Sequence, residues 1–329
     1  MKKEGKKLSK AKLWAIISAA VAVLFSLAII ITNIFIPVKY LASYCVAGKR
    51  AREGIMRVTF VDVGYGDCII AELPDGKNML IDAGCGKYSK NLKVLKELNK
   101  RDIDTIDYLI CSSVNSEHCG GLSEVLRYKT VKTIYMPYCA NKYITDGFRD
   151  FVDQTDKSGA EIIYNEYRVE ERGEEYFFTF LSPSVVRFED NEYSTLDLNP
   201  SNNSRNNVSA VIWLEYLDTA FLFTSDVETS VLEFIASSYK IDPDNYPVNL
   251  GKCKIVQLAG HGSGASACAE LYNLSGAYAA VVSVGENGYG CPSVEVMTNI
   301  ISHVGENLYR TDEYGNVIVE VSDEGITVI

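Results

Sequence analysis

Three histidines supply all the imidazole groups of this 329-residue chain: His118, His261 and His303. His118 directly follows a carboxylate, Glu117, in the segment Ser-Ser-Val-Asn-Ser-Glu-His-Cys-Gly-Gly at residues 112–121. Imidazole and carboxylate groups are common ligands of zinc and manganese ions, and several must converge from separate loops to hold one ion. With so few histidines, the supply of imidazole limits any metal site that the chain could build.

Each candidate residue also has a purely structural interpretation. His118 could form hydrogen bonds within the Gly-Gly turn that follows it, and Asp226 could be the N-cap of the next helix. Cys291 could be a small apolar filler. His303 falls late in an amphipathic helical pattern, so we expect it at the surface. Loop aspartates often accept hydrogen bonds from backbone N–H groups in turns, and three of them have this alternative: Asp62, Asp67 and Asp82.

The N-terminus is first basic and then strongly apolar. The first 12 residues carry six lysines against one acid, and the 24 residues from Leu13 to Ile36 carry no charge. At 1.5 Å per residue, such a run can cross a bilayer core of roughly 30 Å, whereas a signal peptide has a shorter apolar core. We therefore expect a basic cytoplasmic tail (1–12), one transmembrane helix (13–36), a juxtamembrane linker (37–54) and a main domain (55–329). Basic residues favour the cytoplasmic side, so the main domain would lie outside the cell, at a bacterial surface.

The charge balance argues against non-specific nucleic-acid binding. The first 37 residues carry a net charge of +5, so the total of −11 leaves −16 on the remainder. Binding to phosphate backbones depends on Lys and Arg, and an acidic domain is repelled from them.

The nine cysteines show no disulfide framework, because their number is odd and no Cys-x-x-Cys pair occurs. Cys68, Cys111 and Cys253 lie in apolar runs and are expected to be buried.

The expected elements alternate between strand and helix in two successive halves. Between strands at 68–73 and 78–82, the turn Pro74-Asp75-Gly76-Lys77 predicts a hairpin. Residues 159–182 are predicted as two strands around an acidic turn, and 196–207 as a loop. Further helices are expected near 88–100, 122–128, 146–158 and 228–239, and further strands near 58–63, 108–112, 132–136, 208–216, 220–224, 254–258, 279–284, 308–310, 317–321 and 326–328. Two such halves predict an α/β (α+β) fold, a four-layer αββα sandwich with two sheets packed face to face.

Four segments, in order, match a known pattern: VTFVDVGYGDCIIAELPDGKNMLIDAG (58–84), NNVS (206–209), FTSDVE (223–228) and SVGENGYGCPS (283–293). They resemble the metallo-β-lactamase-like domain of ComEC-type bacterial DNA-uptake proteins, with Tyr65 where Gln is usual. The resemblance covers about residues 55–305 and implies the metallo-β-lactamase fold. The multi-span channel of that family has no counterpart here, so a DNA-transport role does not carry over.

The resemblance also implies where metal ligands would lie. In that family two divalent ions, often zinc or manganese, share a hydroxide. At its ligand positions this chain has substitutions at Ser113, Asn115, Gly260 and Cys291. The first ion therefore loses its ligands, but a thiolate is a competent zinc ligand, and a one-ion site is chemically possible. Its candidate ligands are Glu117, His118, Asp226, His261 and Cys291, with Asp226 also the candidate catalytic residue.

Three functions are compatible with this pattern. The first is a membrane-anchored ComEC-like protein with most metal ligands replaced, a weakened or non-catalytic relative of metal-dependent hydrolases, and thus a pseudoenzyme candidate. The second is an active single-metal hydrolase of the phosphodiesterase type, which would use Glu117, His118, Asp226 and Cys291. The third is a surface module that binds a protein partner. The expected cofactor is one zinc or manganese ion, or none if the protein is not catalytic.

Overall fold

The computed structural model of the chain describes residues 50–86, 88–138, 145–183, 185–187, 193–195 and 205–329, together with six isolated positions between 12 and 23. The chain divides into two compact units, Met1–Cys45 and Val46–Ile329. The expected transmembrane helix, 13–36, lies mostly outside the described residues. Among the residues that are described, no helix combines the length and the apolar character needed to cross a membrane.

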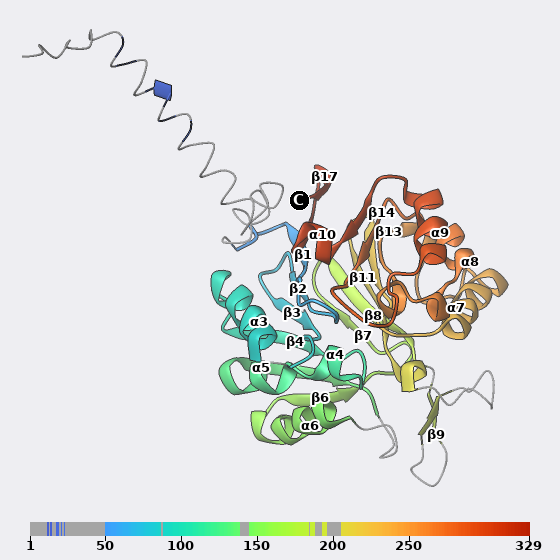
Figure 1. Ribbon diagram of the computed structural model, residues 1–329. Coiled ribbons are helices and arrows are strands. Elements are labelled where there is room, and N and C mark those ends of the chain that lie inside the picture. Colours follow the sequence, from blue (N-terminus) through green and yellow to red (C-terminus); the bar gives the residue numbers. More distant parts are fainter. Residues whose placement is uncertain are drawn as a thin grey trace, which may run out of the picture. The chain divides into compact units, whose positions relative to one another are not determined.

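The first sheet of the second unit has eight strands in the order β17-β16-β1-β2-β3-β4-β5-β6 (Figure 1). Neighbours from β17 to β3 are antiparallel, and those from β3 to β6 are parallel. The predicted hairpin is confirmed: β2 pairs with β3, and Gly76 in the turn has a φ of 80°. The strands are β1 (Met56–Phe60), β2 (Ile69–Glu72), β3 (Asn78–Ile81), β4 (Thr105–Ile110), β5 (Thr130–Met136), β6 (Glu161–Tyr164), β16 (Val317–Ser322) and β17 (Gly325–Val328).

The second sheet has seven strands in the order β15-β14-β13-β12-β11-β8-β7. Its pairs from β7 to β12 are antiparallel and those from β12 to β15 are parallel, so it repeats the mixed design of the first sheet. The strands are β7 (Glu170–Arg172), β8 (Tyr176–Ser182), β11 (Val211–Tyr216), β12 (Thr219–Phe223), β13 (Cys253–Gln257), β14 (Ala279–Val282) and β15 (Leu308–Arg310), and a separate pair is formed by β9 (Val185–Arg187) and β10 (Tyr193–Thr195).

Residues 159–182 form three strands, β6, β7 and β8, and not the two predicted. The acidic stretch that was expected to be a turn contains β7, which pairs with β8 at the edge of the second sheet. An edge strand with one face in solvent can carry charged side chains, and Glu170 and Arg172 are exposed there. The polar sequence of β7 therefore did not indicate a strand.

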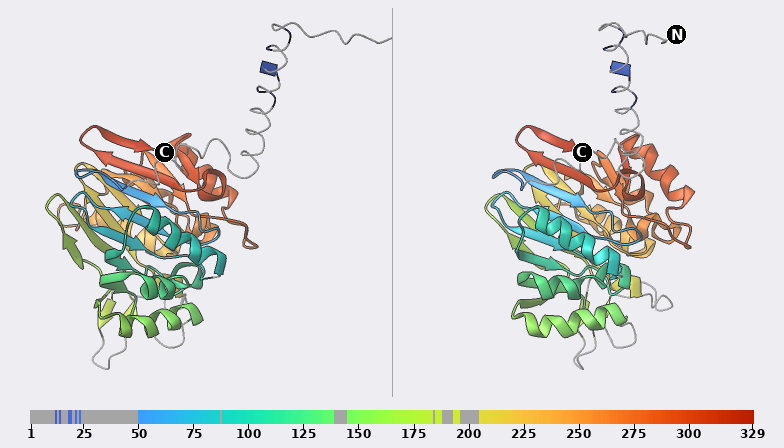
Figure 2. Two further views of the ribbon diagram at one scale, coloured as in Figure 1. Left: turned by 90° about the vertical axis from the view of Figure 1, so that its left-hand side faces the viewer. Right: turned by 60° about the vertical axis from the view of Figure 1, so that its left-hand side comes forward.

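The helices cover the outer faces of the two sheets (Figures 1 and 2). α3 to α6 pack on the first sheet and α7 to α9 on the second. The α-helices are α3 (Tyr88–Lys100), α4 (Ser116–Cys119), α5 (Leu122–Tyr128), α6 (Asp146–Ser158), α7 (Thr229–Ile241), α8 (Ala269–Leu274), α9 (Val294–Val304) and α10 (Thr311–Tyr314). The 3-10 helices are η3 (Arg205–Val208), η4 (Leu250–Lys252), η5 (Ala259–Gly262) and η6 (Gly264–Ser266).

The period-2 alternation of strands explains why three apolar layers form. On β12, Phe221 and Phe223 point into the core between the two sheets, whereas Leu222 points into the core beneath α7 to α9. On β2, Ile69 belongs to the core between the sheets and Ile70 to the core beneath α3 to α6. Both sheets are therefore buried on two faces, and the predicted αββα order of layers is confirmed.

Candidate metal centre

The candidate residues follow the carboxyl ends of strands from both sheets. Asp82 comes directly after β3, and His118 lies in α4 after β4. On the second sheet, Asp226 follows β12 and His261 lies in η5 after β13. Asp67 lies in the loop between β1 and β2. Loops after parallel strands meet at one sheet edge, so the fold itself brings residues far apart in sequence together.

His118, His261 and Asp226 converge on one point. The Nε2 atom of His118 lies 3.0 Å from one oxygen of Asp226, and Nε2 of His261 lies 3.6 Å from the other. The two imidazole rings are 5.3 Å apart between centroids. One ligand atom from each of the three residues lies within 4.8 Å of the others, and all three side chains are buried. Two imidazoles and one carboxylate are a common donor set for a divalent transition-metal ion.

The opposite ring nitrogens are fixed by hydrogen bonds. Nδ1 of His261 lies 2.8 Å from the carbonyl oxygen of Ser283, which can only accept, so Nδ1 carries the proton and donates. Nδ1 of His118 lies 2.9 Å from the carboxylate of Asp82. In neutral imidazoles this leaves the lone pairs on Nε2. Both Nε2 atoms are buried and make no hydrogen bond of good geometry, although that of His118 lies 3.0 Å from Asp226, within ion-pair distance. Proteins orient metal-binding histidines in the same way, through a hydrogen bond at the ring nitrogen that does not face the ion.

Asp82 is held by the start of the loop after β4. It accepts hydrogen bonds from the backbone N–H of Ser112 at 2.8 Å, from the Ser112 hydroxyl and from His118. Its φ is 59°, in the left-handed region where Asp and Asn are tolerated better than most residues. Asp82 is completely buried, and its contacts fix both the position and the tautomer of His118.

Asp67 reaches the same two rings from the loop between β1 and β2. Its carboxylate oxygens lie 3.5 Å from Nδ1 of His118 and 3.6 Å from Nδ1 of His261. Its Oδ1 atom is buried and has no hydrogen-bond partner. Asp67, Asp82 and His118 form a second group whose ligand atoms lie within 4.8 Å of one another.

The charge of this cluster is unbalanced when both imidazoles are neutral. Three buried carboxylates, those of Asp67, Asp82 and Asp226, then face no Lys or Arg ion-pair partner among the described residues. Burial lowers the pKa of His118, but the charges of Asp226 and Asp67 outweigh this and raise it well above its usual value. Burial raises the pKa of Asp226, but His118 and His261 outweigh this and lower it. The cluster therefore attracts positive charge, which either a proton or a metal cation can supply.

The two other predicted ligands lie beside this cluster. Glu117 is half-buried, and its backbone oxygen accepts a hydrogen bond from the N–H of Asp67 at 3.2 Å. Cys291 is half-buried and interacts with Tyr65, and burial raises the pKa of its thiol. Neither residue belongs to the ligand groups formed by the described residues. Coordination by Glu117 or Cys291 stays a prediction.

The substituted family positions have other partners. Ser113 is buried, and its hydroxyl accepts from the backbone N–H of Asn115 at 3.3 Å. The side-chain amide of Asn115 donates to Asp226 at 2.7 Å. At Gly260, whose φ is 57°, an added Cβ would lie 2.7 Å from the Ser266 hydroxyl oxygen. The space around Gly260 therefore leaves no room for the side chain of another residue.

Sequence reasoning missed the convergence of Asp67 and Asp82 on the histidines, because it treated both as turn residues. The signal available was their place at the ends of apolar strands that share an edge of the sheet. The alternative role for Asp226 as a helix N-cap is wrong, since α7 begins at Thr229 and Glu228 is its N-cap. His303 lies at the end of α9, partly exposed and hydrogen-bonded to Asn273, as expected for a surface residue.

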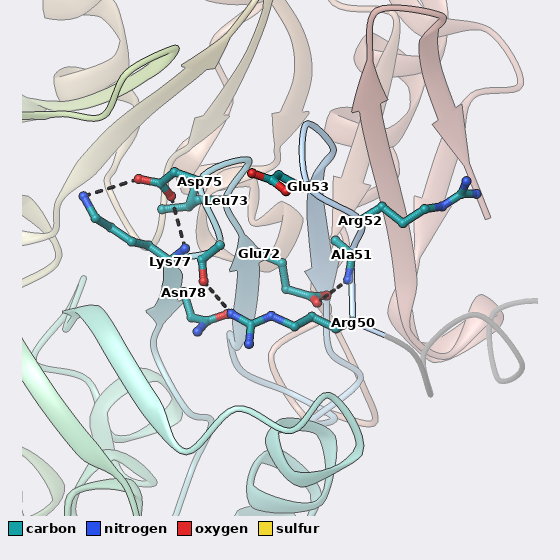
Figure 3. A pocket seen from close by; sticks show the side chains of 10 residues that line it. Arg50, Ala51, Arg52, Glu53, Glu72, Leu73, Asp75, Lys77 and Asn78 are labelled. Carbon is teal, nitrogen blue, oxygen red and sulfur yellow. Dashed lines mark hydrogen bonds and ion pairs between the residues drawn. The ribbon is translucent and has the colours of Figure 1, made fainter.

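A separate shallow cavity of about 210 Å³ lies at the amino end of β3, where its lining includes none of the cluster residues (Figure 3). Some of its polar groups pair with one another: Asp75 lies 3.3 Å from the Lys77 ammonium, and Arg50 donates to the carbonyl oxygen of Gly76. The lining mixes both signs of charge, so it indicates no particular ligand.

Comparisons with known proteins agree on the fold. No family model matches the sequence. ComE operon protein 3 of Bacillus subtilis is 22% identical over 278 residues, which are 79% of this chain but 32% of that protein, so the chain spans about a third of this relative. The crystal structure of CmlA, a diiron β-hydroxylase from Streptomyces venezuelae, matches with a TM-score of 0.52 and 11% identity, over 82% of this chain and 54% of that one. Tm1679, a metal-dependent hydrolase of the β-lactamase superfamily, matches with a TM-score of 0.50 and 16% identity, over 82% and 100%. The chain thus has the metallo-β-lactamase fold that its sequence resembles.

Proposed function

We propose that this domain holds a single divalent cation between His118, His261 and Asp226 and acts as a one-metal hydrolase. The observation that carries the proposal is the pair of buried Nε2 atoms, which face one carboxylate and have no hydrogen-bond partner. Burying such atoms unpaired is costly, and a cation would satisfy both at once. Zinc and manganese are the ions to test, since imidazole favours zinc and carboxylate tolerates either.

Residues around the proposed cation site orient its ligands and add negative charge. Asp82 and the carbonyl oxygen of Ser283 hold the two imidazoles with their Nε2 atoms toward Asp226. Asp67 adds negative charge behind both rings, which strengthens their attraction for a cation. When bound, a divalent cation supplies Lewis acidity and lowers the pKa of a coordinated water.

The structure favours one ion over two. Asn115 directs an N–H donor at Asp226, and an N–H donor cannot coordinate a cation. The Ser113 hydroxyl is engaged by the backbone of the same loop, and Gly260 offers no side chain. The protein ligands that a second ion would need are therefore missing at Ser113, Asn115 and Gly260.

A non-catalytic binding role is the second candidate, and the same Asn115–Asp226 contact favours it. At 2.7 Å this hydrogen bond occupies the oxygen of Asp226 that also approaches His118. If the contact persists, the cluster remains a closed network of side chains, and the domain would be a weakened relative that binds a ligand or protein partner without turnover.

The membrane anchor belongs to the proposal as well. The basic tail (1–12) and the uncharged run (13–36) support one membrane-spanning helix with a cytoplasmic N-terminus and the main domain outside. The protein should then stay with the membrane after extraction at high pH. Protease added to intact cells should remove the main domain; protection of that domain in intact cells would contradict this orientation.

Metal content tests the central proposal. The full chain, purified in detergent without chelator and reconstituted with zinc or manganese, should contain about one equivalent by elemental analysis. His118→Ala, His261→Ala and Asp226→Ala should each lose it, whereas the control His303→Ala should keep it, because His303 lies on α9 and contacts Asn273 instead. Absence of metal in the wild type under both conditions would reject the hydrolase and leave the binding role. Metal-dependent turnover of phosphodiester and ester substrates, abolished by the same three variants, would establish catalysis.

A further inference from the structure

Four rings form a continuous row that leads from the buried cluster to the surface. His118 and His261 are 5.3 Å apart between centroids, His261 and Tyr65 are 4.4 Å apart, and Tyr65 and Tyr289 are 5.1 Å apart. Solvent exposure rises along the row: both histidines are buried, Tyr65 is half-buried, and Tyr289 is 77% exposed. The outer ring is therefore connected by ring contacts to the two proposed metal ligands.

The loop that presents Tyr289 is held firmly. The side chain of Asn287 donates to the carbonyl oxygens of Gly285 and Cys291 at 2.9 and 2.7 Å. It accepts from the backbone N–H groups of Tyr289 and Cys291 at 3.0 and 3.1 Å. All four hydrogen bonds lie within the turn, so its backbone is fixed without help from the tyrosine ring.

The same loop is locked to the loop of the inner tyrosine. An added Cβ at Gly285 would lie 2.5 Å from the Cα of Gly64, so the two backbones pass in direct contact. This places Tyr65 and Tyr289 in a fixed relation, with their ring planes 32° apart. Preorganised aromatic rings bind a ligand with little loss of conformational entropy.

We propose that Tyr289 and Tyr65 form a stacking platform for a planar aromatic ring of the ligand, whose polar end reaches the cluster of His118, His261 and Asp226. This inference rests on the proposed one-metal site, because the cation is what would anchor the polar end. Tyrosine faces prefer offset stacking with another aromatic ring, and the exposed side of Tyr289 is available for it. Exposed Glu286 in the same loop and the net negative charge of the chain disfavour an anionic ring.

Non-hydrolysable phosphonates can test the platform without turnover. 4-Phenylbutylphosphonate and 4-cyclohexylbutylphosphonate carry the same anchor and chain but differ in their rings, and their affinities for the zinc-loaded full chain are measured by calorimetry. The phenyl compound should bind about 3- to 10-fold more tightly, the size of a favourable aromatic pair beyond its buried area. Tyr289→Phe should keep this ratio and Tyr289→Leu should reduce it to about one. Equal ratios in wild type and Tyr289→Leu would overturn the platform.

A metal-free arm separates failure of the platform from failure of the metal site. Saturation-transfer NMR with indole and the chelator-treated full chain should show contact in wild type and Tyr289→Phe and a clear loss in Tyr289→Leu. If zinc is not retained but indole contact depends on the Tyr289 ring, the platform stands and the one-metal proposal fails. If zinc is retained and indole contact is the same in all three proteins, the platform fails and the metal site stands.

Discussion

The side-chain amide of Asn115 donates a 2.7 Å hydrogen bond to Asp226 across 111 residues of sequence, and so joins the loops of the two sheets at the cluster of His118, His261 and Asp226. An amide satisfies one carboxylate oxygen without adding charge, which stabilises the protein without a cation. A carboxylate at the same position would instead repel Asp226 and attract a cation.

Asn115→Asp should therefore lower the melting temperature in the presence of chelator and restore more of it when zinc is added. The lost hydrogen bond to a charged acceptor corresponds to about 1.5–3 kcal/mol of unfolding free energy. Ligand binding to the folded state then adds stability that grows with the logarithm of the ligand's affinity. Asn115→Ala is the matched control, since it loses the donor but gains no ligand. If both variants respond equally to zinc in a thermal-shift measurement, Asn115 does not limit the cation affinity of the site.

Asp82 should control metal affinity without contacting the metal. Asp82→Asn keeps the shape and tolerates the left-handed backbone at this position, but it removes the charge that holds Nδ1 of His118. Loss of such a supporting partner lowers metal affinity by roughly 10- to 100-fold. Zinc affinity is measured by competition with a chromogenic chelator. Ser112→Ala, which removes only one donor to Asp82, should have a smaller effect, and a larger one would mean that the loop position matters more than the Asp82 charge.

Local patterns were sufficient to predict most elements of the fold. The hairpin at Pro74–Lys77 follows from the turn residues between two apolar runs, and it is confirmed. α5 and α6 begin and end where their sequence patterns predicted. Cys68, Cys111 and Cys253 are buried, as their apolar surroundings indicated. Each of these features is decided by residues within one or two turns of the chain.

The site was less predictable, because its geometry depends on which strands become neighbours. Asp67 and Asp82 are 51 and 36 residues before His118 in the sequence, and nothing local shows that their carboxylates meet its ring. His261 was one of five candidate ligands, and it is buried in the cluster beside His118. The substitutions at Ser113 and Gly260 indicated which metal ligands are missing. Only the spatial arrangement shows that two histidines and three aspartates form one buried cluster.

A buried ionic network that includes none of the cluster residues should contribute strongly to stability. Arg101 is completely buried, with its guanidinium 2.8 Å from Glu97 and 3.5 Å from Glu72. Arg101→Met should reduce the free energy of unfolding by about 3 kcal/mol, because it removes the buried cation that Glu97 and Glu72 share and leaves them only Lys100 and Arg57. Lys240→Met is the control: its ion pair with Glu270 is exposed and should account for about 1 kcal/mol or less. Urea denaturation followed by circular dichroism measures both, and equal losses would contradict the role of burial.

The same network should make stability depend on pH in the acid range. Burial raises the pKa of Glu97, but hydrogen bonds from Lys100 and Arg101 outweigh this and lower the pKa below its usual value. A carboxylate whose pKa is lower in the folded state stabilises that state at pH values above the unfolded pKa, and this contribution is lost as pH falls through the folded pKa. Unfolding free energy should therefore decline below about pH 4.5, and Glu97→Gln should show a shallower decline than wild type. Urea denaturation at pH 3 to 7 measures how steeply the unfolding free energy of each protein declines. Glu270→Gln is an exposed control that should follow the wild-type curve. Identical declines for wild type and Glu97→Gln would show that Glu97 does not cause the pH dependence.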